Sequence, residues 1–298
     1  MSLLELKSRI KDIAYLEQEP MSRHTTFKIG GPCLLMAFPW SVEECKVCIL
    51  AAHELGIEPL ILGRGSNLLV ADQGIDRFII KPAKGMDGIQ IEGNTITAGA
   101  AVPLRFLAQR AADAGLSGLE FAHGIPGNLG GALVMNAGAY GGEMKNIVES
   151  VETFAPDGKE VYFTTSDCQF AYRHSIFAEN SHLITAATFT LESGDPVEIQ
   201  ARMAELAQKR RDSQPLDCPS AGSTFKRPKD GFAAALIEQC GLKGTSIGGA
   251  QVSPKHSGFV VNTGDATCAD VLALMELVQK NVLEQTGVCL EPEVKILK

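Results

Sequence analysis

The sequence has no surplus of positive charge and no long apolar run. Its 298 residues contain 27 Lys and Arg against 35 Asp and Glu, a formal net charge of -8. This acidity argues against nucleic acid or an anionic membrane as the main partner. No apolar run reaches the roughly 20 residues that span a bilayer. The charged N-terminal stretch MSLLELKSRIKDIAYLE predicts an amphipathic helix rather than a signal peptide, so we expect a cytoplasmic protein.

The eight cysteines and six histidines also lack the spacing of a metal site. Cys45 and Cys48 form a C-x-x-C, but they lie in SVEECKVCILAAHELG, whose periodicity is that of an amphipathic helix. No second C-x-x-C or histidine cluster completes a tetrahedral site. We therefore predict buried helix residues and no metal, with a redox or metal role as the alternative. The isolated cysteines elsewhere fit a reducing compartment.

The order of predicted elements indicates an α+β protein. Hydrophobic residues make up 45% and charged residues 21%, the balance of a folded globular chain, and the length predicts about two domains. Short strands interleave irregularly with helices, which favours mixed sheets over one doubly wound sheet. Helices are expected over 41–55, 196–212 and 267–284, with a domain boundary near 195–215. No internal repeat is present.

A first glycine loop, GRGSN, lies between two apolar strand segments. Gly63 and Gly65 permit positive φ and close backbone approach, so the N–H groups between them can point at an anion. Ser66 and Asn67 add side-chain donors, and Arg64 adds charge. A strand follows the loop, whereas the Rossmann fingerprint precedes a helix. An ordinary strand–strand turn is the alternative interpretation.

A second, longer loop reads HGIPGNLGGALVMNAGAYGGE. It has glycines at 124, 127, 130, 131, 138, 141 and 142. This density favours a backbone packed against a large planar or phosphorylated ligand over an irregular connector. NLGGALVMN is suited to begin a short helix whose N–H groups face phosphate. Together the two loops indicate a dinucleotide that is held without a Rossmann fingerprint.

A serine in a small-residue turn occurs in CPSAGSTFKRP. Ser223 suggests a nucleophile, yet His182 and His256, the nearest histidines in sequence, are far away along the chain. Neither G-x-S-x-G nor Ser-x-x-Lys surrounds it. A serine without a base is a poor nucleophile, so another role is required.

Eight stretches together resemble the UDP-N-acetylenolpyruvoylglucosamine reductase family, also called UDP-N-acetylmuramate dehydrogenases. They are HTTFKIGGP, LGRGSNLLV, GIPGNLGGALVMNAGAYGGE, YRHS, SAGSTFKRP, GLKG, GGAQVSPKHSGFVVN and LEPEVKI. They occur in the family's order from residue 24 to 297, nearly the whole chain. No long insertion follows YRHS, which resembles the shorter form of the family.

The resemblance implies an FAD-binding fold of the vanillyl-alcohol-oxidase (PCMH) type in two subdomains, followed by an α+β substrate-binding domain. We expect an N-terminal helix and lead-in over 1–22. The FAD-binding domain is expected over 23–195, divided near residue 82. The substrate-binding domain is expected over 205–287, and a final strand carrying a catalytic glutamate over 288–298.

The resemblance also implies the chemistry. NADPH delivers hydride to N5 of non-covalent FAD, hydride passes to C3 of the enolpyruvyl group, and a proton at C2 completes UDP-N-acetylmuramate. The expected partner is a UDP-sugar enolpyruvyl ether, and the expected state is a monomer or weak oligomer. An FAD-linked oxidase of the same fold acting on another substrate is one alternative, against which SAGSTF and EPEV argue. A silent FAD- or nucleotide-binding protein is another, although all three catalytic positions are filled.

The family's functional positions transfer residue by residue. The implied catalytic residues are Ser223 as proton donor, Arg173 and Glu293. The implied cofactor-binding residues are Gly63, Arg64, Gly65, Ser66 and Asn67 at the pyrophosphate, and Ile125, Gly127, Asn128, Gly130, Gly131, Ala137 and Gly138 at or near the flavin. The candidates for substrate binding are Tyr172, Arg211, Gln214, Lys226, Arg227 and Lys255.

Two positions depart from the family's pattern. Asn128 stands where threonine or serine is more frequent, and it should still donate a hydrogen bond. Arg227 replaces an asparagine that some members use near the substrate phosphates. Because arginine binds phosphate bidentately, we expect recognition to persist with altered contacts.

The catalytic residues also have plausible chemical roles. Hydride addition at C3 builds an enolate-like dianion, which the guanidinium of Arg173 can stabilise. An ionised Glu293 would repel that dianion, so it is either protonated through burial or orients a donor such as Arg173 or a water. Without the resemblance, a surface salt bridge and an exposed carboxylate are the simpler interpretations. Covalent attachment of FAD to His123 is not expected.

Overall fold

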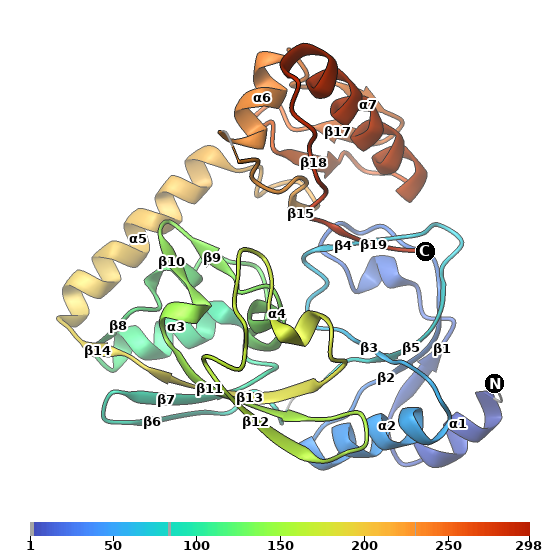
Figure 1. The fold of residues 1–298 in the computed structure, drawn as a ribbon, viewed down its shortest axis with the longest axis vertical. Coiled ribbons are helices and arrows are strands. Elements are labelled where there is room, and N and C mark those ends of the chain that lie inside the picture. The colour runs from blue at the N-terminus through green and yellow to red at the C-terminus, as the bar shows by residue number, and fades with distance from the viewer. Residues whose placement is uncertain (1–2, 83–84, 230) are drawn as a thin grey trace. The chain divides into compact units, whose positions relative to one another are not determined.

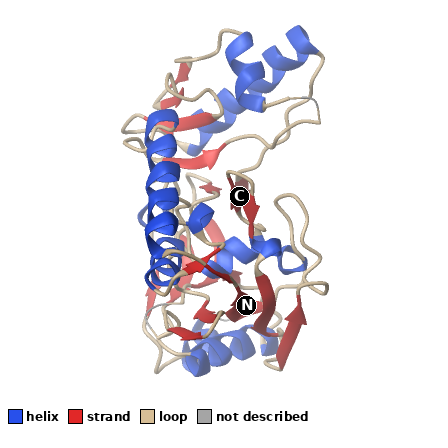
Figure 2. Ribbon diagram, turned by 90° about the vertical axis from the view of Figure 1, so that its left-hand side faces the viewer, coloured by secondary structure: helices blue, strands red, loops and turns tan. Residues whose placement is uncertain are grey.

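The computed structural model describes residues 3–82, 85–229 and 231–298. Helices and strands are mixed along the whole described chain, as predicted for an α+β protein (Figures 1 and 2). The chain divides into two compact units. Unit 1 comprises Met1–Glu17, Leu35–Gly63 and Arg77–Lys209; unit 2 comprises Gln18–Leu34, Arg64–Asp76 and Arg210–Lys298. None of the helices in the described ranges combines the length and apolarity needed to cross a membrane.

Unit 1 contains most of a four-stranded sheet of order β1-β2-β5-β3. Its strands are β1 (Tyr15–Glu17), β2 (Cys33–Ala37), β3 (Leu60–Ile61) and β5 (Ile75–Ile80). Helix α2 (Val42–Glu54) begins after Ser41, whose side chain accepts a hydrogen bond from the Glu44 N–H. The helix predicted over 41–55 is therefore confirmed. Cys45 and Cys48 are buried in it, and burial raises the pKa of Cys45 to about 12 and also raises that of Cys48.

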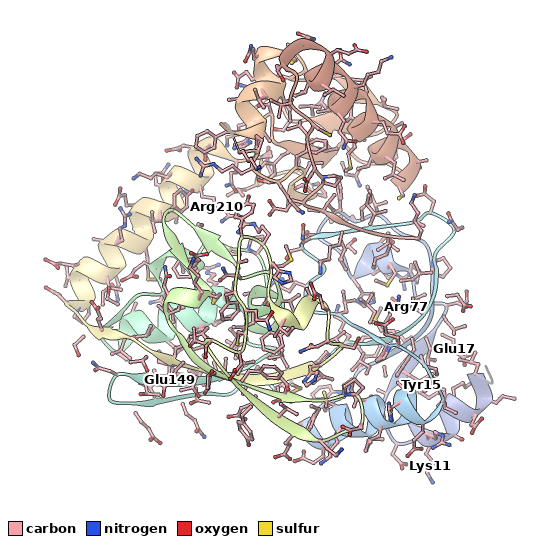
Figure 3. The ribbon with its side chains drawn as sticks, in the orientation of Figure 1. Lys11, Tyr15, Glu17, Arg77, Glu149 and Arg210 are labelled. Carbon is pink, nitrogen blue, oxygen red and sulfur yellow. The ribbon has the colours of Figure 1, made fainter. Side chains whose placement is uncertain are left out.

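The N-terminal helix is shorter than the sequence predicts. Helix α1 covers only Leu3–Arg9, and Tyr15–Glu17 forms the edge strand β1, paired antiparallel with β2. Met1 and Ser2, which the prediction included, lie outside the described residues. Lys7 connects the two elements, because its ammonium donates to the Glu17 carboxylate at 2.7 Å and lies 5.9 Å from the Tyr15 ring centre. Figure 3 labels both Tyr15 and Glu17 on this strand. Pairing with β2, rather than helical periodicity, therefore determines the secondary structure of residues Tyr15–Glu17.

A second sheet in unit 1 has five antiparallel strands in the order β12-β11-β13-β7-β6. The strands are β6 (Ile89–Glu92), β7 (Thr95–Gly99), β11 (Val148–Phe154), β12 (Glu160–Thr164) and β13 (Leu183–Thr190). The remaining helices are α3 (Leu104–Asp113), α4 (Leu129–Val134) and α5 (Pro196–Ser213, which ends in unit 2). Short strands β8 (Leu116–Ser117) and β14 (Glu192–Ser193) form one pair, and β9 (Gly138–Ala139) and β10 (Gly142–Glu143) another. Single 3₁₀ turns cover Glu120–Ala122, Met144–Asn146 and Ile176–Ala178.

Unit 2 is built on a four-stranded antiparallel sheet of order β15-β18-β17-β16. Its elements are β15 (Ser220–Ser223), β16 (Ser246–Ile247), β17 (Ala250–Val252), β18 (Phe259–Asn262), α6 (Ala233–Gln239), α7 (Cys268–Thr286) and a 3₁₀ turn at Met21–Arg23. A separate parallel pair joins β4 (Leu68–Val70) to β19 (Lys295–Leu297). This pair places the residues just before β4 beside the chain that leads into β19.

Helix α7 supplies much of the core of unit 2. Val271, Leu274 and Val278 are at most 1% exposed and recur at helical spacing, so one face of the helix is buried. Thr267 and Asp270 form a capping box at its start. The long helix predicted over 267–284 is confirmed within two residues at its C-terminal end.

Candidate functional site

The second glycine loop is fixed in unit 1 by the chain that precedes α3. The Leu104 N–H donates to the Gly127 carbonyl at 3.0 Å, and the Gly130 N–H donates to the Ala100 carbonyl at 2.9 Å. Asn128, between them, is the extended residue after which α4 begins. The short helix predicted from NLGGALVMN is therefore present, and its first turn has a defined place.

This loop has polar groups that the protein does not satisfy. Among the described residues, the backbone N–H groups of Gly124, Gly127, Asn128 and Gly131 donate to no protein acceptor. The side-chain oxygen of Asn128 is buried and also has no partner. A Cβ built on Gly131 meets nothing within 4 Å. Because buried polar atoms are normally hydrogen-bonded, the buried Asn128 oxygen fits a polar ligand such as FAD lying against the loop, and the half-buried or exposed N–H groups around it are available to the same ligand.

Two other predicted cofactor positions have different surroundings. A Cβ built on Gly63 has the Asn128 Cβ as its near neighbour, at 3.9 Å, so the end of the first loop that lies in unit 1 is close to the second loop. A Cβ on Gly138 would lie 2.8 Å from the Gly142 carbonyl oxygen. Pairing of β9 with β10 is thus sufficient to require glycine at 138. Ala137, just before it, is 9% exposed, and Ile125 is half-buried.

The rest of the first loop belongs to unit 2. Gly65 has φ +61°, and a Cβ there would lie 2.3 Å from the His24 carbonyl oxygen, so only glycine fits. The Thr26 N–H donates to the Gly65 carbonyl at 3.3 Å. Within the described parts of the chain, the N–H groups of Arg64, Gly65 and Ser66 donate to no protein acceptor. Several donors on one small loop suit an anionic group.

Ser223 ends a strand and does not lie in a loop as the sequence suggested. It is the last residue of β15 and pairs with Phe259 of β18. The register shifts between Ser220 and Ser223, where Gly222 has φ +79°. Glycine at 222 allows this local irregularity. The Ser223 hydroxyl is half-buried and has no hydrogen-bond partner among the described residues.

Glu293 is hydrogen-bonded to Thr224, the residue that follows Ser223 in the chain. The Glu293 N–H donates to the Thr224 carbonyl at 2.8 Å. The Thr224 hydroxyl accepts from the Val260 N–H at 2.9 Å, and its own N–H donates to the Gly258 carbonyl at 2.8 Å. Strand β19 starts only at Lys295, so the strand expected over 288–298 is shorter and Glu293 precedes it. The structure thus brings two of the three predicted catalytic residues together within unit 2.

Removing the Thr224 hydroxyl should destabilise this framework. In Thr224→Val the buried Val260 N–H loses its acceptor, so we expect the free energy of unfolding to fall by about 1–3 kcal/mol. Urea denaturation measures the loss. The control is Thr263→Val; Thr263 is an exposed residue whose hydroxyl donates to the Gly249 carbonyl, and its replacement should cost less than about 0.5 kcal/mol. Equal losses would show that Thr224 has no special structural role.

Arg173, the third predicted catalytic residue, lies in unit 1. Its backbone has φ +55°, and the flanking residues Ala171 and His174 form an isolated β-bridge that defines a tight turn. The guanidinium donates to the Gly138 carbonyl at 3.5 Å and lies 5.3 Å from the ring centre of Tyr172. The guanidinium of Arg173 is therefore held next to the second glycine loop, in a fixed orientation suited to binding an anionic group of a ligand.

Of the predicted substrate-binding residues, Tyr172 is in unit 1 and is 53% exposed. The others are in unit 2. Lys226 forms an exposed ion pair with Glu291 at 3.2 Å, the kind of pair that contributes little stability and exchanges readily. Arg227 lies 4.0 Å from the ring centre of Phe232.

Three predicted substrate residues remain: Arg211 in the last turn of α5, Gln214 just after that helix, and Lys255 after β17. The Lys255 ammonium donates to the Arg211 carbonyl, so these two candidates are neighbours. The side-chain oxygen of Gln214 is buried without a hydrogen-bond partner. A buried amide oxygen in this condition could accept from a ligand donor.

Sequence reasoning missed two residues that organise these segments. Thr224 joins Ser223 to Glu293, as described above. Thr26 joins the first loop to β15, since its N–H donates to Gly65 and its hydroxyl donates to the Ser220 carbonyl at 2.7 Å. Both lie inside the stretches HTTFKIGGP and SAGSTFKRP, so their presence in these motifs was the available signal.

His123 is the first residue of the second glycine loop. The Nδ1 atom of His123 is buried without a partner, and burial, with the charge of Arg105, lowers its pKa, so the imidazole is neutral at neutral pH. In the part of the chain that the structure describes, no three His, Cys, Asp or Glu side chains gather as a metal site.

Comparisons with known proteins match two separate parts of this chain to two family models. Residues 33–164 match the family model described as an FAD binding domain, and residues 214–297 match the C-terminal domain of UDP-N-acetylenolpyruvoylglucosamine reductase. The reductase of that name from Caldanaerobacter subterraneus subsp. tengcongensis is 48% identical over 98% of this chain and 97% of its own. The one from Pediococcus pentosaceus is 46% identical over 96% and 95%.

A solved structure extends the likeness to the fold. The crystal structure of UDP-N-acetylenolpyruvylglucosamine reductase from Thermus caldophilus has a TM-score of 0.82 and 35% identity, covering 96% of this chain and 99% of its own. The α+β fold with an FAD-binding domain is therefore confirmed, and the unsatisfied donors of the glycine loops fit that cofactor. The chain belongs to the UDP-N-acetylenolpyruvoylglucosamine reductase family.

Proposed function

We propose that this FAD-dependent oxidoreductase reduces UDP-N-acetylglucosamine enolpyruvate to UDP-N-acetylmuramate, with NADPH as the reductant, in the synthesis of peptidoglycan precursors. The observation that carries the proposal is the hydrogen bond from the Glu293 N–H to the carbonyl of Thr224, the residue that follows Ser223 in the chain. An acid and a carboxylate held by one buried residue suit a reaction that ends in protonation of carbon. The names of the relatives supply the substrate class.

FAD, when bound, supplies the hydride chemistry that connects NADPH to C3 of the enolpyruvyl group. The residues that would hold its pyrophosphate are Gly63, Arg64, Gly65, Ser66 and Asn67. Those that would line the flavin are Ile125, Gly127, Asn128, Gly130 and Gly131, with Ala137 and Gly138 nearby. The donors without protein acceptors in both loops support this assignment.

Ser223 acts as the acid in this proposal. Hydride addition at C3 makes C2 strongly basic, and a hydroxyl that has no hydrogen-bond partner among the described residues can give its proton to that carbon. No base is needed beside a serine that donates a proton, which accounts for the distant histidines. The serine is then reprotonated by water or through Lys226.

Arg173 and Glu293 handle charge. Arg173 stabilises the carboxylate of the substrate as negative charge develops on it. Glu293 either donates as a neutral acid or orients a donor, and its backbone is already fixed by Thr224. For the anionic end of the substrate we propose Lys226, Arg227, Arg211 and Lys255, with Tyr172 and Gln214 as further contacts.

The domain limits given above, 23–195 for FAD binding and 205–287 for the substrate, remain our proposal for how the functions divide along the chain. We also propose a cytoplasmic location and a monomer or weak oligomer. Sedimentation analysis of the purified protein tests the last of these.

Isotope labelling tests the reaction itself. In D₂O with ordinary NADPH, we expect deuterium at C2 of the product, where the acid delivers a proton, and also at C3 to the extent that the N–H hydrogen of the reduced flavin exchanges with solvent before its transfer. Product analysis by NMR and mass spectrometry distinguishes the two positions. Release of hydrogen peroxide without UDP-N-acetylmuramate would contradict the proposal.

Gly131→Leu should weaken FAD binding without weakening the fold. A Cβ at this position is free of protein atoms, and leucine is a better helix former than glycine by about 1 kcal/mol. The side chain would occupy the space proposed for the flavin, so we expect the Kd for FAD to rise at least about tenfold, the effect of losing about 1.4 kcal/mol. Flavin fluorescence titration measures it.

The control for this variant is Gly88→Leu. A Cβ there also meets nothing within 4 Å, but residue 88 lies outside both glycine loops. We expect unchanged FAD affinity. Equal affinity for Gly131→Leu and the unchanged protein would exclude the second loop as a flavin site.

A further inference from the structure

Asn67 connects the first glycine loop to the segment that carries Glu293. Its side-chain amide donates to the Glu293 carbonyl at 3.1 Å, and its own carbonyl accepts from the Lys295 N–H at 2.9 Å. All these residues belong to unit 2. Asn67 therefore contacts the backbone on both sides of Val294, immediately after the glutamate.

The backbone of Glu293 is held at both of its polar groups. Thr224 accepts from its N–H at 2.8 Å, and Asn67 donates to its carbonyl. Because a side chain starts from the Cα–Cβ bond, these two bonds fix the direction in which the Glu293 side chain leaves the backbone. One of them comes from Thr224, the residue just after the proposed acid Ser223. The other comes from the loop proposed for the FAD pyrophosphate.

We propose that Asn67 is a positioning residue for Glu293, and that the loop Arg64–Asn67 transmits the binding of FAD to the catalytic segment. This rests on the proposed function, which places the pyrophosphate on the loop and gives Glu293 a catalytic role. The N–H groups of Arg64, Gly65 and Ser66 have no acceptor in the described protein. A bound diphosphate would supply acceptors, reduce the motion of the loop and so fix Asn67.

The chain offers a matched control for Asn67. The side-chain amide of Gln279 donates to the Leu290 carbonyl at 2.7 Å, a bond of the same type to the same connecting segment, three residues before Glu293. Removing either amide should loosen this segment. Only Asn67→Ala removes the bond at Glu293 itself.

The first experiment is amide hydrogen exchange over residues 290–297, with and without FAD. In the unchanged protein we expect FAD to slow exchange at Glu293 and Lys295. In Asn67→Ala we expect about tenfold faster exchange at Glu293 without FAD, equivalent to about 1.4 kcal/mol, and a smaller effect of FAD there. In Gln279→Ala the FAD effect should persist. This readout does not depend on activity.

The second experiment is a double-mutant cycle in rapid kinetics at saturating FAD. The substrate-driven step is the oxidation of the NADPH-reduced enzyme by the enolpyruvyl substrate. We expect Asn67→Ala to slow this step about 10- to 100-fold and to change the rate of flavin reduction by NADPH by less than about twofold. In a Glu293→Ala background the same change should have less than about a twofold further effect, because there is no carboxylate left to position. Gln279→Ala should slow the step less than Asn67→Ala.

The outcomes separate this inference from the proposed function. Suppose that Glu293→Ala slows the substrate-driven step, and that Asn67→Ala slows this step by the same factor in the unchanged protein and in Glu293→Ala. Asn67 then acts independently of Glu293, and the positioning role is wrong. If Glu293→Ala has no effect, the catalytic role of Glu293 falls, and the positioning role falls with it. If exchange at Glu293 responds to neither FAD nor Asn67→Ala, the loop does not transmit binding.

Discussion

Replacing Ser223 by alanine is expected to slow the oxidation of the NADPH-reduced enzyme by the enolpyruvyl substrate about 10²- to 10⁴-fold. Reduction of the bound flavin by NADPH should stay nearly unchanged, because only the second half-reaction needs a proton at C2. Anaerobic stopped-flow absorbance measures the two half-reactions separately. The large effect is expected because the hydroxyl is half-buried and the protein offers it no other partner in the described residues.

The control for this prediction is Ser220→Ala, the same change at the other end of β15. Ser220 takes part in the fold through its backbone carbonyl, which accepts from Thr26, so loss of its hydroxyl should leave both half-reactions unchanged. If Ser223→Ala impairs both half-reactions equally, Ser223 is a structural residue of the strand and not the acid.

Replacing Arg173 by alanine is expected to slow the same substrate-driven step about 10²- to 10³-fold, the effect of losing one oriented group that stabilises developing charge. The guanidinium is held by the Gly138 carbonyl and the Tyr172 ring before any substrate binds. Alanine and arginine accept φ +55° about equally badly, so backbone strain should not differ between them. Stopped-flow kinetics and thermal unfolding together measure the variant.

Two variants define what the arginine contributes. Arg173→Lys keeps the charge but not the planar fork, so we expect only part of the rate to return. Arg110→Ala removes an exposed arginine from the last turn of α3 and should change neither half-reaction. A substrate-driven rate in Arg173→Ala equal to that of Arg110→Ala would exclude Arg173 from the chemistry.

The periodic elements of the fold could be predicted from the sequence because their signals are local. The helices over 41–55, 196–212 and 267–284 all appear, since each buries apolar residues at helical spacing within a single segment and capping residues mark the start of the first and the third. The two glycine loops could also be located, because the density of glycines is a local signal, and at Gly65 the positive φ and the close His24 carbonyl do require a residue without a side chain.

The connections that assemble the site could not be predicted in this way. Thr26 bonds to a residue 194 positions away, and Asn67 to one 226 positions away. No local pattern encodes such pairs, and the roles of Thr26 and Thr224 were missed for this reason. The same cause explains the N-terminal segment, where pairing with β2 makes Tyr15–Glu17 a strand. The small residues around Ser223 predict a turn, whereas the structure has an irregular strand end there, with Gly222 at positive φ and a shift in strand register.

A two-step titration under anaerobic conditions tests the central claim most directly. The absorbance spectrum of the purified protein should be that of bound FAD, and one equivalent of NADPH should bleach it. Addition of UDP-N-acetylglucosamine enolpyruvate, with oxygen excluded, should then restore the oxidised spectrum and yield UDP-N-acetylmuramate. Rapid return of the spectrum with air, and none with the enolpyruvyl nucleotide, would contradict the account and indicate an oxidase instead.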